Sequence, residues 1–185
     1  MTIVILAAGA ARRMGRQKLL LPIDGEPMVA RVIGAAAAWP TVVVAGPAVA
    51  TVLRDAPVRV IVNDRPERGM VHSLRLADEA VDPAEPIAVL LADVPDVSQG
   101  WIRHIIDAYH GDVDVVAPRT GDQPAHPVVF GPAARRKIVT LADGDTLREL
   151  RDDPSLRRRE VEVLDGSALT DIDTPADYAA RARRP

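Results

Sequence analysis

The stretch Thr2–Lys18, TIVILAAGAARRMGRQK, joins a continuous apolar run to a loop of small and basic residues. The apolar run is rich in β-branched side chains and has no alternating polar face, which is typical of a strand covered on both faces of a parallel sheet. Gly9 and Gly15 let backbone N–H groups approach an anion closely. Arg13 and Lys18 add fixed positive charge. This order predicts a phosphate-binding loop directly after the first strand.

The loop matches neither the dinucleotide-binding glycine fingerprint nor the Walker A pattern. The alternative is an ordinary glycine turn followed by a solvated basic loop. The position of the loop, immediately after the first strand, favours a nucleotide-binding role over that alternative.

Beyond this loop, β-branched runs alternate with stretches whose apolar residues recur at three- and four-residue spacing, which predicts strands and helices in turn. The alternation predicts a three-layer, doubly wound α/β fold: a Rossmann-like mixed, mainly parallel sheet with helices on both faces. Ligands of such sheets bind at the carboxyl ends of the strands. The predicted strands are 2–7, 41–45, 58–62, 87–92, 113–117, 126–130 and 159–164, and the predicted helices are 26–39, 69–81, 99–110, 138–150 and 174–184, the last with Thr174 as N-cap and Pro175 at the first helical position.

Length and composition narrow the function classes. The 185 residues suit one domain over 1–185, and 48% hydrophobic with 26% charged residues suits a globular chain. The net charge of -3 and an aromatic content of 3% argue against nucleic acid as a partner. There is no cysteine, which removes thiolate metal sites and a cysteine nucleophile. No apolar run approaches the length of a membrane span, so a cytoplasmic location and no membrane contact are expected.

Two carboxylates are candidates for holding a magnesium ion. Asp93 follows the apolar run 87–92 and so is placed at the functional edge of the sheet. Asp173 could supply a second carboxylate, with Asp171 as its rival. The alternatives are a turn cap before Pro95 for Asp93 and an N-cap partner for Asp173.

Three further polar residues are candidates for ligand contact. Ser73 could bond a ribose or base, or cap a helix that begins there, and Asn63 has a similar role open to it. His126 could meet an acceptor phosphate, or act only as a local hydrogen-bonding residue at a strand start.

Four motifs, in this order, resemble those of the molybdenum-cofactor cytidylyltransferase branch of the MobA-like nucleotidyltransferases. They are LAAG…RMG..K…LLLPIDGEPM at 6–28, NDRPERGMVHSLRL at 63–76, LLADVP at 90–95 and DIDTPADY at 171–178. The resemblance spans about residues 3–178, nearly the whole chain.

The resemblance implies transfer of a nucleoside monophosphate from an NTP to a phosphorylated acceptor, with release of pyrophosphate and with Mg²⁺ as cofactor. It implies that Arg13, Lys18 and Asp93 serve catalysis. Ala8 stands where guanylyl-transferring relatives carry glycine, which favours CTP over GTP. The implied acceptor is the molybdopterin cofactor, and a molybdoenzyme or its chaperone is then a transient partner. By resemblance, Leu6, Ala7, Ala8 and Gly9 line the base. Together with Arg13 and Lys18 of the loop, and with Asn63 and Ser73, they are the candidate nucleotide-binding residues.

The sequence departs from the family pattern at several positions, including Ala10–Arg12, His72 and Val94, and these departures leave the acceptor open. A sugar-phosphate nucleotidyltransferase is the first alternative. An NAD(P)H-dependent oxidoreductase of the nicotine blue oxidoreductase type is the second, although the expected glycine fingerprint is missing. A non-enzymatic nucleotide-binding module is the third.

Overall fold

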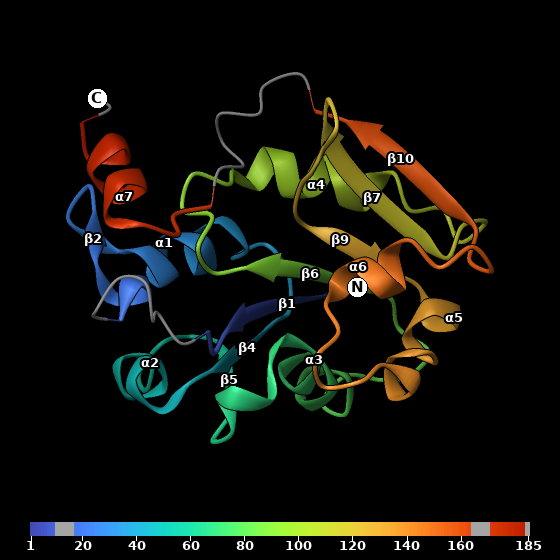
Figure 1. Ribbon diagram of the computed structural model, residues 1–185, viewed down its shortest axis with the longest axis horizontal. Coiled ribbons are helices and arrows are strands. Elements are labelled where there is room, and N and C mark those ends of the chain that lie inside the picture. Colours follow the sequence, from blue (N-terminus) through green and yellow to red (C-terminus); the bar gives the residue numbers. More distant parts are fainter. Residues whose placement is uncertain (10–16, 164–170, 184–185) are drawn as a thin grey trace.

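The computed structural model describes residues 1–9, 17–163 and 171–183. Its main sheet has the strand order β10-β7-β9-β6-β1-β4-β5, with β8 paired to β7. All pairings along this order are parallel except the two made by β9, which runs antiparallel to β6 and β7. The mixed, mainly parallel sheet predicted from the sequence is therefore confirmed (Figure 1). The strands are β1 (Thr2–Ala7), β4 (Thr41–Ala45), β5 (Arg59–Val62), β6 (Ile87–Leu91), β7 (Val115–Thr120), β8 (Gln123–Pro124), β9 (Val128–Phe130) and β10 (Arg158–Glu162), with a separate hairpin of β2 (Pro22–Ile23) and β3 (Glu26–Pro27).

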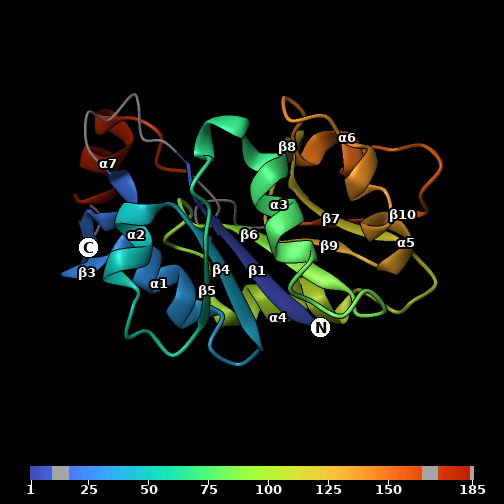
Figure 2. The same ribbon diagram turned by 90° about the horizontal axis from the view of Figure 1, so that it is seen from below.

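Helices cover both faces of the sheet. Figure 2 shows α4 on one side of the strands and α3 with α6 on the other. The helices are α1 (Met28–Ala35), α2 (Pro47–Val52), α3 (Met70–Asp78), α4 (Gln99–Asp107), α5 (Pro132–Arg135), α6 (Leu147–Arg151) and α7 (Pro175–Arg181), and 3₁₀ turns are η2 (Lys18–Leu20), η3 (Pro66–Arg68) and η4 (Ile138–Thr140).

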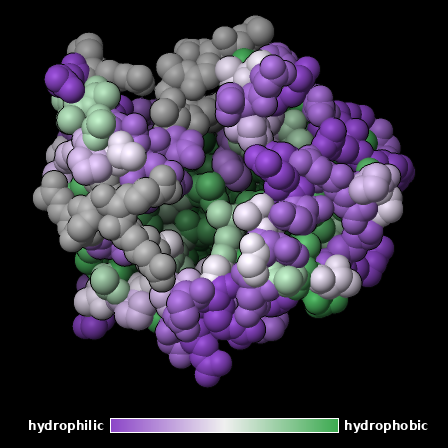
Figure 3. Space-filling view, viewed as in Figure 1, coloured by the Kyte–Doolittle hydropathy of each residue, from purple (hydrophilic) through white to green (hydrophobic). Residues whose placement is uncertain are grey.

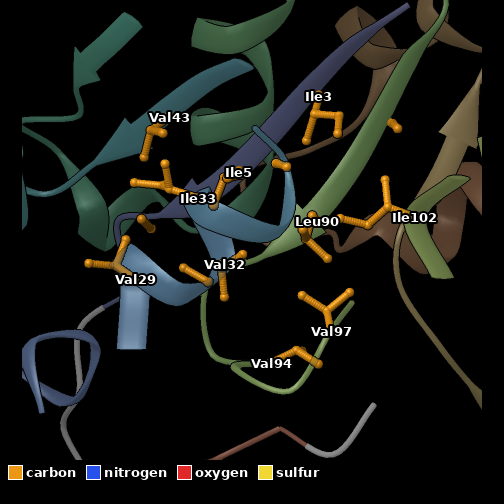
Figure 4. Close-up of a cluster of buried hydrophobic side chains, with 14 of the residues drawn as sticks. Ile3, Ile5, Val29, Val32, Ile33, Val43, Leu90, Val94, Val97 and Ile102 are labelled. Atoms are coloured by element: carbon orange, nitrogen blue, oxygen red, sulfur yellow. The ribbon is translucent and has the colours of Figure 1, made fainter. Parts of the chain in front are cut away.

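Strand β1 is buried along its whole length because both of its faces meet helices. Ile3 and Ile5 point to the core beneath α1 and α4, where Val32 and Ile102 pack (Figure 4). The alternate residues of the strand enter the second core, against α3. This two-sided burial explains why the strand sequence is apolar throughout rather than alternating.

The chain leaves β1 toward β4 and β5 on one side, and later returns to β6 on the other side. Because β1 and β6 are neighbours at this reversal, their carboxyl ends form the topological switch point of the sheet. Leu6 is paired in register with Leu91, which brings the segments that follow the two strands side by side.

The predicted helix over 138–150 is wrong. The chain forms η4, then a turn, and α6 begins only at Leu147. Local side chains compete for the backbone here: Asp145 accepts a hydrogen bond from the Ala142 N–H at 2.7 Å, and Thr146 forms a capping box with Glu149. These bonds end the preceding 3₁₀ turn η4 and begin a separate helix, α6, after Thr146.

Residues 174 and 175 behave as predicted: Thr174 caps α7 and Pro175 occupies its first turn. No helix among the described residues is long and apolar enough to cross a membrane. The single domain over 1–185 stays a prediction.

Candidate active site

A cavity of about 300 Å³ lies at the switch point of the sheet. In Figure 3 a hollow with a hydrophobic floor opens near the centre of the face shown. The apolar part of the wall comes from the strand ends and from the first turn of α3, and its polar part includes one cation and one carboxylate. The cavity is lined by Leu6, Ala8, Gly9, Lys18, Leu19, Pro66, Gly69, Met70, Ser73, Leu91 and Asp93.

Lys18 lies at the polar edge of this cavity, at the start of η2. Its ammonium Nζ donates to Asp93 Oδ2 and to Asp173 Oδ1, both at 2.8 Å. Only 12% of the Lys18 side chain is exposed. Burial lowers the pKa of the ammonium, but the two carboxylates outweigh burial and raise that pKa above its ordinary value. Lys18 is therefore firmly cationic.

Asp93 offers one carboxylate oxygen that is not used by Lys18. Its Oδ1 atom is buried and has no hydrogen-bond partner within residues 1–9, 17–163 and 171–183. A buried acceptor without a donor is costly, and a bound cation would satisfy it. The residues present therefore fit a divalent metal ion held by Asp93 and Asp173.

These residues suit a metal ion whose remaining ligands are supplied by the substrate. The described part of the chain gathers no group of three or more His, Cys, Asp or Glu residues able to hold a metal by themselves. Magnesium is commonly bound by one or two carboxylates with phosphate oxygens completing its shell. The two aspartates suit that kind of site.

Asp173, rather than Asp171, reaches Lys18. Asp171 is exposed, whereas Asp173 follows the buried Ile172 into the site. The Ile172 N–H donates to the backbone carbonyl of Asp93 at 3.0 Å, so the two aspartate-bearing segments are directly joined.

Asn63 and Ser73 form a buried polar pair at the cavity. Asn63 Nδ2 donates to Ser73 Oγ at 2.9 Å, and the Arg65 N–H donates to Asn63 Oδ1 at 2.8 Å. Ser73 does not cap α3, since that helix begins at Met70 with Gly69 as N-cap. With its oxygen already accepting from Asn63, the Ser73 hydroxyl is oriented to donate.

Only some of the remaining predicted nucleotide-binding residues line the cavity. Leu6, Ala8 and Gly9 line the cavity, whereas the Ala7 side chain is fully buried in the core under α1. Among the described residues, a Cβ at Gly9 would meet no heavy atom within 4 Å. Arg13 lies outside the described residues.

His126 is partly buried beside β6, and the cavity lining given above does not include it. Burial lowers the pKa of its imidazole, against smaller opposing effects from a hydrogen bond to the Val89 backbone and from Asp93 and Asp171. Its backbone carbonyl accepts from Trp101 Nε1 at 2.8 Å. Burial therefore favours the neutral form of this imidazole, and Asp93 and Asp171 are the carboxylates that act on it.

Sequence reasoning missed the turn that precedes α3. Gly69 has φ +90°, and a Cβ there would lie 2.7 Å from the carbonyl oxygen of Asp143. Arg68 and Arg75 both pair with the Asp143 carboxylate, at 2.8 and 2.7 Å. The sequence Arg68-Gly69-Met70 could have indicated this turn, but Asp143, which the turn contacts, is 75 residues from Arg68 in the chain.

The model of the MobA-like NTP transferase domain matches residues 3–161. Nicotine blue oxidoreductase from Paenarthrobacter nicotinovorans is 30% identical over 186 residues, covering 92% of this chain and 91% of that protein. The bifunctional protein GlmU from Rhodospirillum rubrum is 34% identical over 157 residues, covering 80% of this chain. This chain spans about a third of the length of that relative, 34% of it.

Among solved structures, Rv0371c from Mycobacterium tuberculosis is similar over 99% of this chain and 97% of its own, with a TM-score of 0.87 and 29% identity. A structure of Rv0371c in complex with manganese covers 100% of this chain and 98% of its own, with a TM-score of 0.83 and 26% identity. The domain match covers most of the chain, including β1 from Ile3 onward, the Asn63–Ser73 pair and Asp93. The chain belongs to the MobA-like NTP transferase family, a family of nucleotidyltransferases.

Proposed function

We propose that this protein transfers a nucleoside monophosphate, CMP from CTP, to a phosphorylated acceptor with release of pyrophosphate. The favoured acceptor is the molybdopterin cofactor. The transfer depends on Mg²⁺ and takes place in the cytoplasm, in a single domain over residues 1–185.

The observation that carries this proposal is the arrangement of Lys18 between Asp93 and Asp173 at the edge of an apolar cavity. A nucleotide presents a flat base, whose faces pack against apolar side chains, and an anionic phosphate chain, and the cavity offers a wall for each. The carboxylates of Asp93 and Asp173 can bind a metal cation, and the ammonium of Lys18 can bind phosphate. Together they suit a metal-bound triphosphate.

In the reaction, an acceptor phosphate oxygen forms a bond to the α-phosphorus as the bond from that phosphorus to the pyrophosphate oxygen breaks. The acceptor is already anionic, so no strong general base is required, and positioning with charge stabilisation does most of the work. Magnesium, when bound, supplies charge neutralisation on the phosphates, and Asp93 and Asp173 would hold it. Lys18 would donate to the phosphate oxygens as charge moves onto the leaving group.

Arg13 completes the proposed set of phosphate ligands, on the basis of the family resemblance. Leu6, Ala8 and Gly9 would face the base, while Ala7 would contribute only through its backbone. The Ser73 hydroxyl, held as a donor by Asn63, would meet an acceptor atom of the base or ribose. The alanine at position 8 supports cytosine over guanine by the same resemblance.

His126 would contribute on the acceptor side, as a neutral imidazole near Asp93. A sugar 1-phosphate is the alternative acceptor. If the acceptor is the pterin, the finished cofactor would pass to a molybdoenzyme or its chaperone through a transient contact.

A second candidate function follows from one relative: nicotine blue oxidoreductase matches nearly the full length of this chain. An NAD(P)H-dependent reaction on this fold would leave the paired carboxylates around Lys18 without an evident role. Binding of an NTP rather than NADH distinguishes the nucleotidyltransferase from the oxidoreductase.

Thermal-shift titration with CTP, GTP, UTP, ATP and NADH, each with and without Mg²⁺, tests the proposal. A ligand that binds only the folded state raises the melting temperature by mass action, about 2.7 kcal/mol of stabilisation at one hundred times its Kd. We expect the largest magnesium-dependent shift with CTP. A shift with NADH and none with any NTP would overturn the transferase. Pyrophosphate release with molybdopterin, set against sugar 1-phosphates, then identifies the acceptor.

A further inference from the structure

The position of Asp173 depends on how the segment 171–183 is attached to the rest of the protein. Asp173 lies immediately before α7, and α7 lies beside β2 and α1, far from β10 in both ribbon views (Figures 1 and 2). Two contacts hold the start and middle of this segment. Ile172 is buried and bonds the Asp93 backbone, and the Tyr178 hydroxyl donates to the Pro22 carbonyl at 2.7 Å.

Arg181, the last residue of α7, makes the strongest attachment. Its Nε donates to Asp96 Oδ2 at 2.6 Å and to Oδ1 at 2.8 Å, and its Nη2 donates to Asp24 at 2.8 Å. Only 11% of the Arg181 side chain is exposed. Asp96 is 23% exposed and Asp24 is 50% exposed. Charged hydrogen bonds that are shielded from water are stronger than exposed ones, so the contact with Asp96 contributes most to fixing this end of α7.

Arg31, from α1, closes the network around the same two carboxylates. Its Nη1 lies 3.2 Å from Asp24 Oδ2, and its Nη2 lies 3.9 Å from Asp96 Oδ1. Its Nε donates to the Pro95 carbonyl at 3.3 Å. Two arginines therefore balance two aspartates, and the loop that follows Asp93 is held as firmly as α7.

The network joins the two segments that bear the site carboxylates. Asp96 is three residues beyond Asp93 on one loop, and Arg181 is at the far end of the helix that follows Asp173. The contact between Arg181 and Asp96 therefore joins the segment that carries Asp173 to the loop that carries Asp93. Neither Arg181 nor Asp96 lines the cavity.

We propose that Arg181 is a positioning residue for the metal site: through Asp96 and Asp24 it holds α7 so that Asp173 faces Asp93 across one cation. This inference rests on the proposed function. Magnesium requires near-ideal ligand geometry, so a loosened carboxylate binds it less well. Residues that orient metal ligands without touching the metal typically change metal affinity by about 10–100-fold.

Mn²⁺ binding to the full chain in the presence of CTP, measured by electron paramagnetic resonance, tests this role. We expect Arg181→Ala to weaken Mn²⁺ binding by about 10–100-fold and to leave metal-free CTP binding within about twofold. Arg181→Lys keeps one cation near Asp96 and should recover part of the loss. The matched control is Arg158→Ala, which removes an arginine paired to Asp152 and Glu160 on the outer strand β10, and it should leave Mn²⁺ affinity unchanged.

Unchanged Mn²⁺ affinity in folded Arg181→Ala would overturn the positioning role, as would an equal loss of metal-free CTP binding, which indicates general destabilisation. If Arg181→Ala does not fold, Asp96→Asn decides by the same two measurements, with a smaller expected weakening of Mn²⁺ binding. The proposed function fails differently: the unaltered protein would then bind no CTP, or Asp93→Asn would bind Mn²⁺ as well as the unaltered protein.

Discussion

Two clusters of charge in the molecule differ in what surrounds them. The site cluster, Lys18 with Asp93 and Asp173, lies at the carboxyl ends of the parallel strands, and its lysine is 12% exposed. The outer cluster lines a second hollow of about 430 Å³ near β7, β10 and α6 and is composed of Arg119, Arg151, Asp152, Arg158 and Glu160.

The outer cluster is paired, and its members are open to water except Arg151, whose side chain is 16% exposed. Arg158 contacts both Asp152 at 2.6 Å and Glu160 at 2.9 Å, and the three side chains are 36–45% exposed. Exposed pairs of this kind contribute about 0–1 kcal/mol each to stability. The site cluster instead retains a buried Asp93 oxygen without a partner among the described residues. The low exposure of Lys18 and the unsatisfied Asp93 oxygen are features of a binding site, whereas exposed, paired charges are common on any protein surface.

The largest expected effect separates the clusters by one matched substitution. Asp93→Asn removes the negative charge that would hold the metal, so we expect turnover to fall on the order of 10²–10³-fold. Asp152→Asn makes the same chemical change in the outer cluster and should leave turnover within about twofold. Pyrophosphate release with CTP, Mg²⁺ and the proposed acceptor, molybdopterin, measures both variants.

Circular dichroism on both variants confirms that each is folded before turnover is compared. Equal activity in Asp93→Asn and Asp152→Asn would show that the site cluster does not hold a catalytic metal and that the two clusters do not differ in function.

Lys18→Met is expected to change two measurements in opposite directions. Without the ammonium, Asp93 and Asp173 lose their internal cation, so Mn²⁺ alone should bind more tightly than to the unaltered protein. Turnover should nevertheless fall, by about tenfold or more, because phosphate charge loses a donor. Isothermal titration with Mn²⁺, without nucleotide, measures the first effect.

Arg158→Met is the control for this substitution, and it should change neither metal binding nor turnover. Weaker binding of Mn²⁺ alone to Lys18→Met would contradict the competition between Lys18 and the metal.

The features predicted from sequence are those in which a local pattern decides the structure. The strand β1 and the place of Asp93 after β6 could be predicted from short stretches of sequence. A strand that is buried on both faces is apolar throughout, and a polar residue directly after such a run marks the end of the strand. The paired contacts of Lys18 could not, since Asp173 is 155 residues away in the chain. Long-range ion pairs depend on how segments pack, and no periodicity encodes them.

The failures have equally specific causes. The helix predicted over 138–150 is interrupted because Asp145 and Thr146 bind backbone N–H groups, a local competition that apolar spacing does not register. Ser73 resembles an N-cap in sequence, yet α3 begins three residues earlier and Ser73 pairs with Asn63. The contact between Arg181 and Asp96 joins residues 85 positions apart in the chain, so no local pattern predicts it.

The smallest expected effect concerns an exposed pair beside the outer cluster. Lys137 lies 2.6 Å from Asp153, and this contact, helped by Ser155, lowers the pKa of Asp153 to about 2. A carboxyl whose pKa is lowered by folding stabilises the protein above its unfolded pKa, and that contribution is lost as pH falls through the folded value. The stabilisation should therefore be complete above about pH 4 and lost toward pH 2.

Lys137→Met removes the larger cause and should move the Asp153 pKa upward, toward the ordinary value for aspartate, as followed by carboxyl chemical shifts in a pH titration. Urea unfolding should show a small difference between the two proteins at neutral pH that shrinks as the pH is lowered to 2. Mn²⁺ binding at neutral pH should be identical in both, because Asp153 remains ionised there and lies in a different part of the fold from Lys18. A change in Mn²⁺ affinity would mean that the outer charges act on the site at long range, and the distinction between the two clusters would then have to rest on burial alone.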